Sequence, residues 1–247
     1  MWKKALTFSL LASLDFVAGA RLQNKVVQHG TEVLWIPTAE IRQRIIGYTL
    51  RSLHFRGKSE RVIGGVLDGF WDRSVDSVES GIAHRGLIER FVEGKSWEET
   101  CYFKAVQRKF ALGKRHRLDT SAAGFLERKM AAWDRLFESM RDDGYKTHAE
   151  LLAAEAQGDW VPVMIPKEIE IAIGRDGAMI LCDGKHRFAM ATILKLEMIP
   201  VVVNVWHRHY VDRFIAECGE PVTAENLMAF RAMGRRPGPV HKGQPGS

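Results

Sequence analysis

Hydrophobic residues recur at helical spacing along much of the first two thirds of the chain. Thr38 is placed to cap a helix that runs through Ile41, Ile45 and Ile46. The capping box from Ser96 to Glu99 precedes a second predicted helix. One face of that helix carries Tyr102, Phe103, Val106 and Phe110.

A longer apolar series continues the helical pattern toward residue 157. It comprises Leu126, Met130, Trp133, Phe137 and Met140, and this spacing is typical of a helix face in the protein core. A second capping box, Thr147 to Glu150, predicts another short helix, and Gly144 suits the end of the helix before it. Residues 31–157 are therefore predicted to be mainly helical.

The hydrophobic period changes from helix to strand after Gln157, Gly158 and Asp159. The predicted strands cover residues 163–165, 169–173, 178–181 and 200–205. Asp176-Gly177 predicts a hairpin turn between two of them. A helix is predicted over 187–195, and another from Thr223 to about Met233.

These patterns predict an α+β protein, with a mainly helical N-terminal region packed on a small α/β domain. The predicted divisions are 1–158 for the helical region, 159–216 for the α/β domain and 217–234 for a C-terminal helix. Residues 235–247 are rich in Gly and Pro and are predicted to be a disordered tail.

The main candidate site lies where a predicted strand turns into a predicted helix, at Asp183-Gly184-Lys185-His186-Arg187. Glycine lets the backbone approach a ligand, and the first helical turn presents N–H groups and the positive end of the helix dipole. Three basic side chains add cationic donors, so the segment predicts a cradle for phosphate or carboxylate. The alternative is a common Asp-Gly turn followed by a solvated basic surface. Asp183 could itself offset part of this positive charge.

The segments around this motif resemble the ParB/sulfiredoxin superfamily. The resemblance rests on residues 168–177, on the run from Asp183 to Arg187, on 199–203 and on Arg208-His209, and it covers about Val163 to Tyr210. It implies a compact α/β fold that binds nucleotide phosphates through Gly184, Lys185, His186 and Arg187. Residues 66–73, after Gly64-Gly65, resemble a further segment of some relatives and make Asp72 and Arg73 candidates for lining the cleft.

Lys185 separates this chain from the better-known branches of that superfamily. Sulfiredoxins have their catalytic cysteine at this position, whereas Cys182 lies three residues earlier. Partition ParB proteins have a glutamate there, and no helix-turn-helix pattern follows Tyr210. The free serine kinases of this fold carry D-G-H-H-R, which the run from Asp183 to Arg187 matches except at Lys185. The resemblance is therefore closest to the kinases.

A kinase needs a carboxylate that accepts the proton of the substrate hydroxyl, and Mg²⁺ usually shields the phosphates. Asp183, Glu170 and Glu168 are the candidates, although Asp183 could equally cap the next helix, and Glu168 and Glu170 could face solvent on a strand. Arg208 and His209 follow a predicted buried strand and are further candidates for lining the cleft.

The composition and the net charge are compatible with several kinds of anionic partner and do not select one. Hydrophobic residues make up 46% of the chain and the net charge is +6, which favours anionic partners such as nucleotides, nucleic acid or acidic lipid. The cluster from Lys114 to Arg117 is interpreted as a solvated surface. The three cysteines lack C-x-x-C spacing and indicate reduced thiols in a cytoplasmic protein.

Residues 1–20 allow two interpretations. Lys3 and Lys4 precede a short apolar run, and Ala18-Gly19-Ala20 has the form of a signal-peptide cleavage site, which would mean export. The run is too short to span a membrane, and we favour a packing helix over a signal peptide.

The function predicted from these features is a nucleotide-binding phosphotransferase that acts on a small hydroxylated molecule. The nucleotide is ATP, ADP or CTP, with Mg²⁺ as the expected cofactor. Two alternatives remain: a ParB-like nucleic-acid-binding or nuclease protein, and a non-catalytic nucleotide-binding module.

Overall fold

The fold was analysed in a computed structural model that describes residues 22–26, 32–46, 64–114, 121–158, 168–219 and 222–233. These residues form a mixed α+β structure, as the sequence predicts. The strands are β1 (Leu22–Val26), β2 (Leu34–Pro37), β3 (Ile41–Ile45), β4 (Gly65–Leu67), β5 (Val75–Ser77), β6 (Ile169–Ile173), β7 (Met179–Asp183) and β8 (Met198–His207).

All of these strands belong to one sheet in the described part of the chain, in the order β1-β4-β8-β6-β7-β3-β5, with β2 also paired to β8. The β4–β8, β6–β8 and β3–β7 pairs are parallel, and the β1–β4, β2–β8, β6–β7 and β3–β5 pairs are antiparallel. The sheet therefore combines strands from both sides of residue 158. The division into domains predicted from the sequence stays a prediction.

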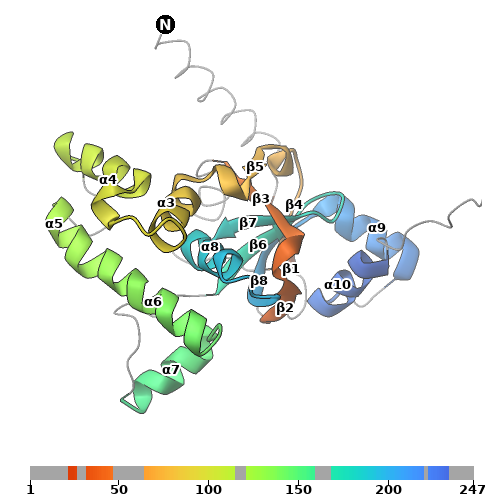
Figure 1. The fold of residues 1–247 in the computed structure, drawn as a ribbon. Coiled ribbons are helices and arrows are strands. Elements are labelled where there is room, and N and C mark those ends of the chain that lie inside the picture. The colour runs from red at the N-terminus through yellow and green to blue at the C-terminus, as the bar shows by residue number, and fades with distance from the viewer. Residues whose placement is uncertain are drawn as a thin grey trace, which may run out of the picture.

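Helices lie on two sides of the sheet in Figure 1. The α-helices are α3 (Ile82–Phe91), α4 (Cys101–Ala111), α5 (Ala122–Phe125), α6 (Ala131–Asp142), α7 (His148–Ala156), α8 (Lys185–Ile193), α9 (Arg208–Cys218) and α10 (Ala224–Met233). Short 3₁₀ helices are η1 (Thr38–Glu40), η2 (Trp71–Arg73), η3 (Val78–Ser80) and η4 (Trp97–Glu99), and a π-helical turn, η5 (Leu126–Met130), joins α5 to α6. Helices α3 to α7 extend away from the sheet on the side of α8, and α9 and α10 lie at the other end of the molecule.

Alternate residues of the central strands supply two hydrophobic clusters. Ile169, Ile171 and Ile173 of β6 pack into the main core, together with Phe188 of α8 and the aromatic residues of the helical region. Ala172, which lies between Ile171 and Ile173, belongs instead to a smaller cluster with Leu67, Trp71, Ile180 and Val205. This alternation follows from the two-residue period of a strand that is buried on both faces.

One predicted helix is wrong. Residues 38–46 form η1 and β3, and β3 pairs with β7 and β5. The spacing of Ile41 and Ile45 fits one helix face, but sheet pairing overrides this local signal. Thr38 caps no helix through 41–46, because its hydroxyl donates to the Leu196 carbonyl at 2.5 Å.

Most of the other predicted elements are confirmed with small shifts. β6, the turn at Asp176-Gly177, and both capping boxes are as predicted, and α8 begins two residues earlier than predicted. The sequence analysis did not predict β2, β4, β5 or α9. The predictions for residues 1–20, 163–165 and 235–247 lie outside the described residues. Among the described helices, none combines the length and apolar character that crossing a membrane requires.

Candidate anion-binding site

The predicted cradle is built at the junction of β7 and α8. Gly184 is the N-cap of α8 and has φ 81° and ψ 18°, a left-handed conformation that glycine adopts without strain. A Cβ at this position would lie 3.0 Å from Cα of Ile169, so the turn is also tightly packed. Gly184, as the N-cap residue, offers no side-chain oxygen to the helix, and Lys185 is exposed on the first turn. The backbone N–H groups and one cation thus share the start of α8.

Two of the predicted catalytic carboxylates lie beside this turn on neighbouring strands. Glu170 of β6 is the register partner of Asp183 of β7. An Asp183 carboxylate oxygen accepts a hydrogen bond from the Gly184 N–H at 2.8 Å, and Glu170 accepts one from Asn204 Nδ2 at 3.0 Å. Glu170 is only 5% exposed, so the alternative of a solvent-facing side chain is wrong for this residue. Every residue of β6 is buried, because this central strand has a hydrophobic cluster on each face of the sheet.

Arg187, in contrast, points into the protein. It is 4% exposed, and its guanidinium carbon lies 4.0 Å from the ring centroid of Tyr145. One terminal nitrogen donates to the Lys146 carbonyl at 2.5 Å, and the other lies 3.7 Å from a carboxylate oxygen of Glu168. Arg187 therefore ties α8 to the segment before α7. A phosphate contact from this side chain stays a prediction.

Glu168, the third predicted catalytic carboxylate, is part of the same buried connection. It is 8% exposed, so a solvent-facing position is wrong for it as well. Its Oε1 accepts a hydrogen bond of 2.5 Å from the His148 N–H at the start of α7, where a negative charge is favourable. Its other oxygen faces Arg187. The structure thus gives Glu168 a bridging role between two helices.

His186 is oriented toward the aromatic residues of the helical region. Its ring centroid lies 4.1 Å from that of Trp133 and 5.6 Å from that of Tyr102. Both aromatic side chains are buried. Of the predicted phosphate-binding side chains, Lys185 is exposed, His186 is partly exposed and Arg187 is buried.

Asp72, one of the four residues predicted to line the cleft, lies at the other end of the β6–β7 hairpin from the cradle. Asp72, on η2, accepts three close hydrogen bonds from Arg175 in the hairpin turn, at 2.9 Å from the backbone and at 2.8 and 2.7 Å from the side chain. Burial raises the pKa of Asp72, but these hydrogen bonds outweigh it and hold the pKa below its ordinary value. The turn and the Glu170–Asp183 pair are separated by about 10 Å of strand. Asp72 and the cradle are therefore not brought together.

The other three candidates for lining the cleft are also near this second end of the hairpin or on α9. Arg73 lies over the ring of Phe70 at 4.8 Å, and Arg208 pairs with Asp212 within α9. His209 donates its backbone N–H to Nδ1 of His207 at 3.1 Å.

The fully buried His207 has both ring nitrogens engaged. Its Nε2 lies 2.9 Å from the Gly69 carbonyl and, because Nδ1 accepts from His209, Nε2 carries the proton. A metal site at His207 and His209 is not supported by this arrangement. Within the described ranges, no three His, Cys, Asp or Glu side chains are grouped closely enough to hold a metal ion.

All three cysteines are free, as predicted. Cys182 is half-buried next to Asp183, and burial, with a smaller contribution from Glu170 and Asp183, raises the pKa of its thiol. A thiol with a raised pKa is a poor nucleophile at neutral pH.

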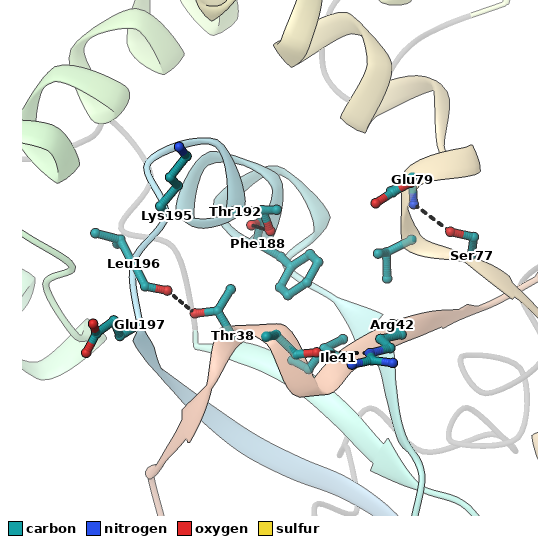
Figure 2. A pocket seen from close by; sticks show the side chains of 12 residues that line it. Thr38, Ile41, Arg42, Ser77, Glu79, Phe188, Thr192, Lys195, Leu196 and Glu197 are labelled. Carbon is teal, nitrogen blue, oxygen red and sulfur yellow. Dashed lines mark hydrogen bonds between the residues drawn. The ribbon is translucent and has the colours of Figure 1, made fainter.

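A separate pocket lies at the opposite end of α8 (Figure 2). Its volume is about 630 Å³, and Phe188 points toward its centre. Its wall contains two basic and two acidic residues, Arg42, Lys195, Glu79 and Glu197. Because both signs of charge are present, the pocket does not select a ligand charge. From Lys185 to Lys195 the chain spans about 15 Å along the helix axis, so the pocket is distinct from the cradle.

Comparisons with known proteins give no family for this chain. No protein-family model, curated protein or solved structure matches it. The interpretation of the site therefore depends on its own chemistry.

Sequence reasoning missed Tyr145, Trp133 and Arg175 as parts of these clusters. Arg175 had a usable signal, because it occupies the hairpin turn directly after a strand. Tyr145 and Trp133 had none, since they reach α8 from a loop and a helix more than 40 residues earlier in the chain.

Proposed function

We propose that the chain is a nucleotide-binding phosphotransferase with a ParB/sulfiredoxin-like arrangement, and that it acts on a small hydroxylated molecule. The observation that carries the proposal is the start of α8 at the exposed Lys185, directly after left-handed Gly184. This arrangement offers backbone donors, a helix dipole and an exposed ammonium to one anion. The terminal phosphate of ATP, ADP or CTP is such an anion.

Asp183 is proposed as the general base, because it is the carboxylate adjacent to the turn. Glu170, its neighbour in the sheet, is buried and is proposed to position Asp183 or a metal ion. Glu168 is a weaker candidate than the sequence suggested, since its carboxylate is engaged by His148 and faces Arg187.

The donor set at this turn fits Mg²⁺. This ion prefers hard oxygen ligands and is usually bound by one or two carboxylates together with substrate phosphates and water. Asp183 and Glu170 are two carboxylates at paired positions beside the proposed phosphate site. When bound, Mg²⁺ would shield the phosphate charges.

A thermal-shift screen of the full chain against ATP, ADP and CTP, with and without Mg²⁺, tests binding. At a nucleotide concentration about 100 times Kd, binding stabilises the protein by about 2.7 kcal/mol. For a chain of this size that corresponds to a rise in Tm of roughly 5–11 °C. A transfer assay with hydroxylated acceptors then tests turnover.

Asp183→Asn separates binding from catalysis. It keeps the shape of the side chain and removes its ability to accept a proton, so we expect nucleotide binding to persist and turnover to fall by about 10²–10⁴-fold. Asp212→Asn on α9 is the matched control and should leave turnover unchanged. Binding without turnover in the wild-type chain would favour the non-catalytic nucleotide-binding module.

A further inference from the structure

One stretch of the chain contains basic residues and no acidic ones. Six Lys or Arg residues and no acidic residue occur between Thr100 and Leu118. Since the whole chain has 36 basic and 30 acidic residues, the remainder has 30 of each and is electrically balanced. This stretch alone thus carries a net charge of +6, as much as the whole chain.

Helix α4 displays much of this charge on its outer side. Its apolar residues Tyr102, Phe103 and Val106 are buried in the main core, and Phe110 packs against it. Lys104 and Arg108 are one turn apart on the opposite face and are exposed. Lys109 on the flank and Lys114 just after the helix are exposed as well. We call these four residues the α4 basic face.

The α4 basic face differs from other basic positions in its pairing. Within the described residues, no salt bridge involves any of its four side chains. Arg85, Arg90 and Arg175 instead pair with Glu93, Asp134 and Asp72. Glu99, just before the helix, accepts a hydrogen bond from the Ser96 N–H, and Lys104 makes a small contribution to the lowered pKa of its carboxyl. Like charges one turn apart destabilise a helix slightly, and an external polyanion would relieve this.

We propose that the α4 basic face binds the phosphate backbone of a nucleic acid. Four exposed cations that form no salt bridge among the described residues are complementary to a regular array of phosphates, and contacts to phosphate need no particular base sequence. An acidic membrane is a poorer fit, because a helix that binds a membrane surface inserts its apolar face, and that of α4 is buried in the core. The proposal is independent of the phosphotransferase function, since it involves none of the residues at the β7–α8 turn.

The charge of the face sets the expected salt dependence. Four phosphate contacts to duplex DNA give a slope of log K against log salt of about −3.6. Each basic residue removed from the face should reduce the magnitude of this slope by about 1.

The test is fluorescence anisotropy of a short labelled DNA duplex and a short labelled RNA strand, titrated with the full chain at several salt concentrations. Lys104→Gln with Arg108→Gln removes two charges from the face. Arg141→Gln with Arg213→Gln removes two charges from α6 and α9 and is the matched control. We expect the first double variant to reduce the magnitude of the duplex slope by about 2 and the control to retain the wild-type slope. Thermal melts verify that both variants are folded.

Three results would overturn the proposal. The first is no binding of either probe by the wild-type chain at about 50 mM salt, where phosphate contacts are strong. The second is an equal loss of affinity in both double variants, which would reflect overall charge alone. The third is binding to phosphatidylserine vesicles that depends on Lys104 and Arg108 while binding to nucleic acid does not.

Discussion

Replacing Arg187 with Met tests the structural role of this buried side chain. Methionine retains an unbranched apolar side chain but loses the guanidinium. The substitution removes the hydrogen bond to the Lys146 carbonyl, the contact with the Tyr145 ring and the cation that faces Glu168. Glu168 is 8% exposed, so its carboxylate would stay buried without its charged neighbour.

The expected loss of stability is large because one member of a buried ion pair is removed. Such changes cost about 3–5 kcal/mol. For a protein of this length, each kcal/mol lowers Tm by about 2–4 °C, so the variant should melt roughly 6–20 °C below the wild type. Arg141→Met, at an exposed arginine on α6, is the control and should leave Tm unchanged.

A double-mutant cycle with Glu168→Gln tests the cause of this loss. The neutral Gln can still accept the hydrogen bond from the His148 N–H but leaves no unpaired charge. Arg187→Met should therefore cost at least about 1 kcal/mol less in the Glu168→Gln background. A Tm for Arg187→Met within about 2 °C of the wild type would refute this reasoning. Equal costs of Arg187→Met in the two backgrounds would show that Glu168 is not the partner.

Three further substitutions have defined outcomes. Lys195 has φ 56° after the end of α8, where glycine is usual, so Lys195→Gly should stabilise the protein by about 1 kcal/mol in urea unfolding; a loss of stability would contradict this. Gly184→Ala should destabilise by at least about 1–2 kcal/mol and weaken anion binding, because alanine is strained at φ 81° and its Cβ would approach Ile169; an unchanged melting curve would contradict this packing. Arg175→Met should cost about 2 kcal/mol at pH 7, allowing for partial exposure of the pair. Because the pKa of Asp72 is lowered in the folded state, this contribution is fully present above its ordinary value of 3.8. It is lost as pH falls below 3.8 through the folded-state pKa, and a difference that persists unchanged at lower pH would argue against the ion pair.

The elements with strong local signals were predictable from the sequence. The capping boxes identify hydrogen bonds within four residues, and the run from Ile169 to Ile173 places isoleucine at every second position, the period of a strand. The glycine turn before α8 was predictable for the same reason, since its left-handed conformation is a local requirement.

The elements that depend on distant partners were not predictable. β3 becomes a strand because β7, more than 130 residues later, pairs with it. The burial of Arg187 was likewise hidden, since Tyr145 and Lys146 approach it from another part of the chain. Three adjacent basic residues thus have different surroundings: Lys185 is exposed, His186 is partly exposed and Arg187 is buried.

The most direct test of the proposed anion site compares nucleotide affinity in the wild type, Lys185→Ala and Lys185→Glu by isothermal titration calorimetry with Mg²⁺ present. Lys185→Ala removes an attraction and should weaken binding by about 1.5–3 kcal/mol, or roughly 10- to 150-fold. Lys185→Glu adds a repulsion and should weaken binding further. Equal affinity in all three proteins, or tighter binding by Lys185→Glu, would contradict an anion contact at Lys185.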